Sequence, residues 1–119
     1  MSAREISIDT LVMPGSVAVV LPIIRRLGVR EVVDSLCPMQ WCKGATHGQV
    51  AEMLLLHILQ AERRLPLYAL EEWVEHNDIG PLLDCPAQAF NDDRVGRALE
   101  AFAAALPQLE AQLVARAVL

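Results

Sequence analysis

The chain has 119 residues, of which 54% are hydrophobic and 4% aromatic, and its formal net charge is −5 at pH 7. This length suits one domain with an aliphatic core, so we expect residues 1–119 to form a single domain, and the hydrophobic content excludes disorder as the main state. The excess of acidic over basic residues excludes a chain-wide basic surface for nucleic acid.

The first third of the chain predicts short elements. Residues 5–12 alternate weakly between apolar and polar side chains, which permits a short strand or an extended arm. Pro22 suits the first turn of a helix, where its missing N–H costs nothing, and this helix should end at Leu27 with Gly28 as its cap. Residues 30–36 predict another short amphipathic helix. Its inward-facing residues are Val32, Val33 and Leu36.

The strongest local signal is the tetrapeptide Thr46-His47-Gly48-Gln49. It fits a capping box, in which the Thr46 side chain caps the helix and the Gln49 side chain reaches back to the backbone of Thr46. The helix that begins here should continue to about Glu62. Because it is apolar nearly all round, we expect it to be the central buried helix of the fold.

A polar break separates this helix from the next one. Pro66 opens a helix that runs to about His76, and residues 79–83 predict one further turn. The apolar face expected for the helix consists of Leu67, Leu70, Trp73 and Val74. The same helix also carries Glu71, Glu72 and Glu75, which make it a poor reader of a DNA major groove.

Asn91 caps the next helix, whose first turn holds two acids that the helix dipole favours. The predicted apolar seam of this helix is Val95, Leu99, Phe102 and Leu106. If that seam is buried, Leu99→Ala should cost about 2–5 kcal/mol. Pro107 starts a last helix. The predicted fold class is therefore all-α: a small bundle of five or six helices, with room for an N-terminal strand or extended arm.

The cysteines predict neither disulfides nor a metal site. Cys37, Cys42 and Cys85 are an odd number in a chain without a secretory signal. Together with His47 they lack the paired spacing of a zinc site, so we interpret them as small hydrophobic residues and expect no metal or cofactor. The most apolar stretch, residues 50–59, is shorter than the about 20 residues that span a bilayer. We therefore expect a cytoplasmic protein with no membrane partner.

No catalytic motif is present. The sequence lacks a nucleophile elbow, a phosphate-cradling glycine loop and a zinc-protease motif. Asp92 and Asp93 are adjacent on a helix and point about 100° apart, so they do not converge on one metal or proton. His57 lies mid-helix on the apolar face, where a core histidine is a simpler interpretation than a ligand or general base. We expect no catalytic residue in this chain.

Several segments, taken as a set, resemble a known family. They are the Thr46-to-Gln49 box with its leucine-rich helix, Pro66-Leu67-Tyr68, Glu72-Trp73, and the run from Asn91 to Leu99. The set resembles the N-terminal domain, long of unknown function, of bacterial insertion-sequence transposases of the DDE type. The resemblance implies a larger ribonuclease-H-like catalytic domain in the same polypeptide, so no acid of this chain is implied to be catalytic. A last helix without a terminating Gly, Asn or Pro also suggests a longer protein.

The resemblance implies a non-catalytic module that binds transposon-end DNA, assembles transposase protomers, or does both. The candidate DNA-binding residues are His47, Gln49, Arg63, Arg64, Asn91, Arg94 and Arg97. Arg and Asn side chains suit bidentate contacts with guanine and adenine, and residues 46–62 with 66–76 could form a helix-turn-helix. The acidic balance favours the alternative, a helical protein-interaction domain that dimerises or packs on its own catalytic domain without touching DNA.

Overall fold

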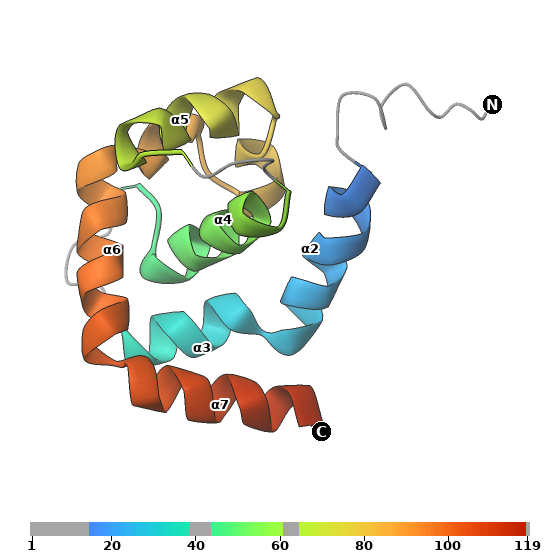
Figure 1. The fold of residues 1–119 in the computed structure, drawn as a ribbon, viewed down its shortest axis with the longest axis vertical. Coiled ribbons are helices and arrows are strands. Elements are labelled where there is room, and N and C mark those ends of the chain that lie inside the picture. The colour runs from blue at the N-terminus through green and yellow to red at the C-terminus, as the bar shows by residue number, and fades with distance from the viewer. Residues whose placement is uncertain (1–14, 39–43, 61–64, 119) are drawn as a thin grey trace.

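The computed structural model describes residues 15–38, 44–60 and 65–118, and every regular element in these ranges is helical (Figure 1). The predicted all-α class is therefore confirmed. The α-helices are α2 (Gly15–Leu27), α3 (Val29–Leu36), α4 (His47–Gln60), α5 (Leu67–His76), α6 (Asp92–Ala104) and α7 (Leu106–Val118). Two 3-10 helices, η2 (Gly80–Leu83) and η3 (Ala87–Phe90), lie between α5 and α6. The strand or arm expected at residues 5–12 lies outside the described residues.

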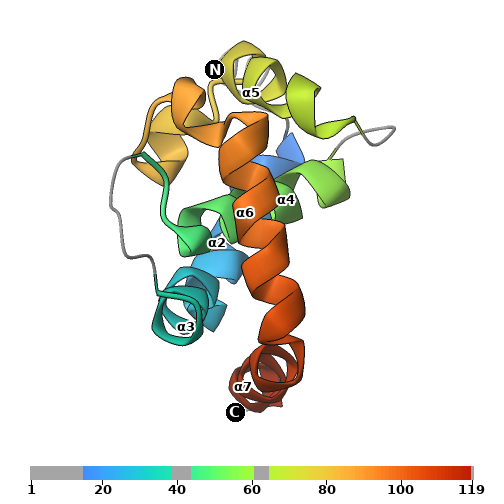
Figure 2. The same cartoon turned by 90° about the vertical axis from the view of Figure 1, so that its left-hand side faces the viewer.

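Helix α4 lies in the middle of the molecule, as predicted, and packs against α2, α3, α6 and η2 (Figure 1). Helix α5 and the two 3-10 helices lie at one end, and α7 lies beneath α3 at the other, with α6 running between the two ends (Figure 2). The largest fully buried apolar side chains are Met53, Leu56, Leu70, Ile79, Leu83 and Phe90. None of the described helices is long and apolar enough to cross a membrane.

The helix ends follow the local signals in the sequence. Gly28 has a φ of +71°, a conformation that L-residues with a side chain rarely adopt, and its N–H donates to the Arg25 carbonyl at 3.1 Å. Asn91 caps α6, since its Oδ1 accepts from the Arg94 N–H at 2.9 Å. Both predicted caps are confirmed, because each depends only on residues close in sequence.

The prediction for Pro22 is wrong. Helix α2 begins at Gly15, so Pro22 lies inside the helix instead of in its first turn. An interior proline removes one backbone hydrogen bond and costs about 3 kcal/mol. The helix nevertheless continues through it, because Val17, Leu21 and Ile24 on its inner face are all buried in the core. Tertiary burial outweighs the local cost.

The seam predicted for α6 is correct at Val95 and Phe102 and wrong at Leu99 and Leu106. Leu99 is 41% exposed and Leu106 is 51% exposed, whereas Val95 and Ala98 are completely buried and Phe102 is partly buried. The buried positions 95, 98 and 102 are themselves spaced as one helix face. The condition for a large Leu99→Ala effect is therefore not met. Leu67 of α5 is likewise exposed, while Leu70 and Val74 are buried as predicted.

Candidate functional site

His47 and Arg94 join the two sequence motifs in space. His47 is the first residue of α4, and its Nδ1 lies 2.8 Å from an Nη atom of Arg94 in the first turn of α6. A guanidinium group can only donate, so Nδ1 accepts and the imidazole is neutral with its proton on Nε2. His47 is buried and meets the ring of Phe102 edge-on, with the centroids 6.2 Å apart.

The electrostatics of this pair agree with a neutral histidine. Burial lowers the pKa of His47, the Arg94 charge lowers it further, and the Asp34 carboxylate opposes the change. Burial also lowers the pKa of Arg94, with Arg97 acting in the same direction. The pair therefore ties α4 to α6 inside the fold, where His47 is buried and its Nδ1 is occupied by Arg94.

The predicted capping box at the start of α4 is confirmed. The Gln49 N–H donates to the Thr46 Oγ1 at 3.1 Å, and the Thr46 N–H donates to the Gln49 Oε1 at 2.9 Å. The Gln49 amide also donates to the Leu83 carbonyl at 2.8 Å, which fixes η2 against α4. With its amide oxygen and nitrogen used in this way and its side chain buried, Gln49 is not placed to read a base.

Asp34 of α3 also contacts the capping box at the start of α4, and the sequence analysis missed this residue. Its carboxylate accepts from the Thr46 hydroxyl at 3.0 Å and from the Gly48 N–H at 2.7 Å. A carboxylate at the N-terminus of a helix is stabilised by the free N–H groups there. Gly48 allows this approach, because a Cβ at that position would lie only 2.5 Å from the Arg30 carbonyl oxygen. The four-residue box is thus a docking point between α3 and α4.

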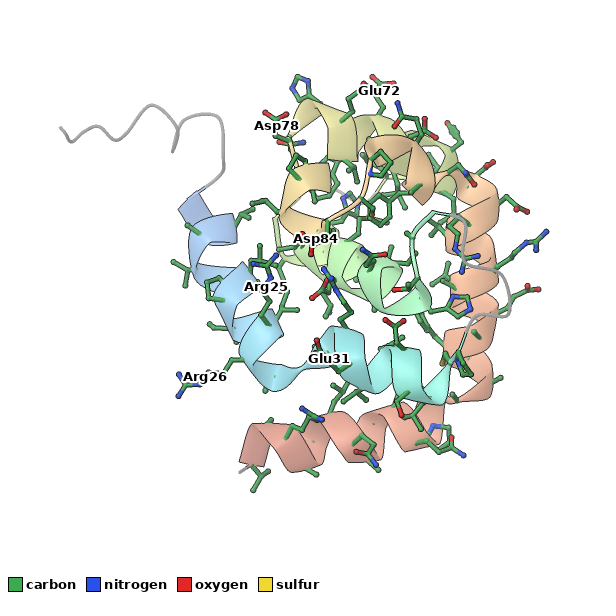
Figure 3. The ribbon with its side chains drawn as sticks, turned by 180° about the vertical axis from the view of Figure 1, so that it is seen from behind. Arg25, Arg26, Glu31, Glu72, Asp78 and Asp84 are labelled. Carbon is green, nitrogen blue, oxygen red and sulfur yellow. The ribbon has the colours of Figure 1, made fainter. Side chains whose placement is uncertain are left out.

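A second polar cluster, also missed, lies where α3, α4 and η2 meet. Arg30 pairs with Glu52, whose side chain is only 2% exposed, at 2.6 Å, and with the exposed Asp84 at 3.1 Å. Arg30 also donates to the Leu83 carbonyl at 3.2 Å. Burial raises the pKa of Glu52, and the hydrogen bond and charge of Arg30 oppose that change. Figure 3 shows this side of the molecule, with Asp84 above Glu31.

The remaining candidates that the structure describes, Asn91 and Arg97, are both engaged in contacts within their own segment. Asn91 is exposed, but its oxygen caps α6 and its amide donates to the Gln88 carbonyl at 3.2 Å. Arg97 is exposed and forms an ion pair with Asp93 at 3.2 Å, four residues earlier on α6. Arg63 and Arg64 lie outside the described residues. Among the described candidates, only Asn91 and Arg97 are exposed at the surface.

His57 and Cys37 are buried side chains with contacts inside the fold. The His57 Nε2 accepts from the Leu65 N–H at 3.2 Å, and its ring lies edge-on to Trp73 with the centroids 4.8 Å apart. Cys37 is buried, and burial raises the pKa of Cys85 to about 11. Within the described part of the chain, no group of three or more His, Cys, Asp or Glu side chains could hold a metal ion. Cys42 lies outside that part.

An apolar groove of about 300 Å³ lies on the surface between α3, α4, α6 and α7. Its lining includes Val33, Leu54, Leu55, Phe102, Leu109 and Leu113. Ile58 and Leu106 also line it, and both are about half exposed. Among the described residues, Glu110 is the one charged residue in the lining. An open groove of this composition suits an apolar side-chain row of another helix rather than a nucleic acid.

Comparison with known proteins gives one match. A family model described as "Domain of unknown function (DUF4277)" matches residues 7–114. No curated protein and no solved structure matches the chain.

Proposed function

The chain belongs to the DUF4277 family of domains of unknown function, and we propose that it is a non-catalytic assembly module of a DNA transposase. The transposase part of the proposal is supported by the resemblance of residues 46–49 and 91–99 to the N-terminal domains of insertion-sequence transposases. The His47–Arg94 contact agrees with that resemblance, since it makes the two motifs parts of one structural unit.

One observation favours assembly over DNA reading: three of the candidate DNA-binding residues, His47, Gln49 and Arg94, have their partners within the fold. His47 and Gln49 are buried, and Arg94 donates a hydrogen bond to His47. Arg97 is paired with an acid of its own helix. A DNA-reading helix needs Arg or Asn side chains free to reach base edges, together with unpaired cations for the phosphates. The surface instead offers the apolar groove, which suits contact with protein.

A DNA-binding titration distinguishes an assembly module from a module that binds transposon ends. The 119-residue chain is titrated against a duplex carrying the terminal inverted repeat of the element and against a scrambled duplex, at about 50 mM and about 200 mM salt. We expect weak binding with no preference between the duplexes. A clear preference for the terminal repeat, with affinity that falls steeply with salt, would replace assembly by DNA-end binding.

A second measurement tests assembly directly. The full-length transposase and a version lacking residues 15–118 are compared by light scattering at equal concentration. We expect the full-length protein to associate and the shortened protein to associate less. If the two proteins have the same oligomeric state, this domain does not assemble protomers.

A further inference from the structure

We infer that the apolar groove receives α2 of a second copy of this chain, so that copies join head to tail. This inference rests on the proposed assembly function and names the partner and the contact. A contact in which one surface of each copy meets a different surface of the next is a heterologous interface, which builds rings or open chains.

The groove defines what its occupant must offer. Its walls are aliphatic and aromatic side chains of α3, α4, α6 and α7, and Ile58 and Leu106 stand at its exposed edge. A helix that fits such a groove presents apolar side chains three or four residues apart. The acid in the lining, Glu110, adds a requirement for a basic residue beside that apolar row.

The outer face of α2 meets both requirements. Val19 is 63% exposed and Ile23 is 53% exposed, and the two are four residues apart on one face of the helix. Arg26 follows three residues later on the same face. Arg26 makes no ion pair with any described residue, and Figure 3 shows it pointing away from the body of the molecule. We call Val19, Ile23 and Arg26 the α2 ridge.

The ridge of one copy cannot fill the groove of the same copy. The opposite face of α2 carries Val17, Leu21 and Ile24, which are buried in the core. The ridge therefore points outward while the helix remains packed on its own molecule. The α2 ridge and the groove are complementary surfaces. In this inference each stays exposed to solvent until the matching surface of a second copy covers it.

Charge favours ridge-to-groove contact over groove-to-groove contact. Arg26 on the ridge and Glu110 in the groove have opposite charges and would meet at the edge of an apolar contact. Two grooves facing each other would bring two Glu110 side chains together, and the described lining of the groove holds no base to pair with them. In a chain with a net charge of −5, a contact that pairs an acid with a base also reduces the repulsion between copies.

The test uses one substitution on each surface. Ile23→Asp on the ridge and Ile58→Asp in the groove are compared with the wild-type chain by sedimentation velocity, and Tyr68→Asp on the exposed side of α5 is the matched control. We expect wild-type chain and control to form a concentration-dependent series of oligomers up to about 1 mM. Each of the two variants alone should weaken association about 100-fold, because a buried carboxylate in an apolar contact is costly. Circular dichroism checks that all variants remain helical.

Mixing the two variants gives the result that only a head-to-tail contact predicts. Ile23→Asp keeps an intact groove and Ile58→Asp keeps an intact ridge, so an equal mixture should form a 1:1 dimer and nothing larger. Arg26→Glu and Glu110→Arg should each weaken association, and the chain carrying both changes should recover it. Failure of the mixture to dimerise would overturn the inference.

The other outcomes separate this inference from the proposed function. If Ile58→Asp abolishes association and Ile23→Asp does not, the groove pairs with another groove, and assembly remains supported. If the 119-residue chain stays monomeric while the full-length transposase associates through this domain, the groove holds a different segment. If neither associates, the inference and the proposed function are both wrong.

Discussion

At the scale of the residue, Gly48 shows how closely α3 and α4 approach each other. An added Cβ would lie 2.5 Å from the Arg30 carbonyl oxygen and 2.8 Å from side-chain carbons of Arg30 and Asp34. Since one of these atoms belongs to the backbone, the helices themselves would have to separate. The glycine is thus required by packing, at a position where the backbone would otherwise favour alanine.

We therefore expect Gly48→Ala to lower the free energy of unfolding by about 1–3 kcal/mol, as overpacked sites do. Gly96→Ala is the matched control, since nothing lies within 4 Å of its Cβ position and it is inside helix α6. That control should raise the free energy of unfolding by about 0.5–1 kcal/mol. Urea denaturation of both variants measures the two effects, and equal effects in one direction would contradict the packing argument.

The His47–Arg94 pair makes stability depend on pH. The pKa of His47 in the folded chain lies below its ordinary value of 6.5, so below that pH the unfolded chain binds more protons. The free energy of unfolding should consequently fall as the pH falls through about 6.5. His47→Gln keeps a side-chain oxygen that can accept from Arg94 but does not titrate. We expect the wild-type chain to lose more stability than this variant between pH 7.5 and pH 5, by about 1 kcal/mol or less.

Urea denaturation of both proteins across this range gives the comparison. The two proteins differ only at residue 47, so the contributions of all other titratable groups cancel in the difference between the two curves. Parallel curves would mean that His47 has the same protonation in the folded and unfolded states.

At the scale of the element, the Arg30–Glu52 ion pair holds α3 against α4. Arg30→Met should lower the free energy of unfolding by about 3–5 kcal/mol, because it leaves the buried Glu52 carboxylate without its partner. Replacing both residues, with Arg30→Met and Glu52→Leu, should recover most of the loss. Asp93→Asn, which breaks the exposed pair with Arg97, is the control and should cost less than about 1 kcal/mol. Thermal or urea denaturation gives all three values, and a large loss in the double variant would contradict this account.

The elements themselves were predictable to the extent that their signals are local. Thr46 with Gln49 and Asn91 with Arg94 interact three residues apart, and both helix starts are where the sequence places them. Pro22 was misplaced because burial of its neighbours, which depends on distant residues, overrides a local preference.

The candidate site was less predictable, because its contacts join residues far apart in the chain. His47 and Arg94 were both singled out, yet their contact spans 47 positions and turns two candidate DNA ligands into one internal link. Glu52 was not singled out from the sequence, since nothing near it in the chain indicates Arg30 as its partner. A sequence motif of polar residues can thus mark a junction of the fold as readily as a binding surface.

At the scale of the whole molecule, α7 is the helix least attached to the core. Leu109 is its one buried residue, whereas α4 contributes Val50, Met53 and Leu56, all completely buried. Opening α7 exposes little apolar surface, so its amide hydrogens should exchange through local opening, while those of α4 should need global unfolding. We expect protection of α4 to exceed that of α7 by several powers of ten in native-state hydrogen exchange at low protein concentration.

The same measurement connects stability with assembly, because α7 forms one wall of the groove. When a second copy occupies the groove, opening α7 must also break that contact, so its protection should rise with protein concentration while that of α4 stays constant. Ile58→Asp, which blocks the groove, should remove the concentration dependence without altering α7 at low concentration. Protection of α7 that equals that of α4 in the dilute monomer would show that this wall is already rigid, and that occupation of the groove is not what orders it.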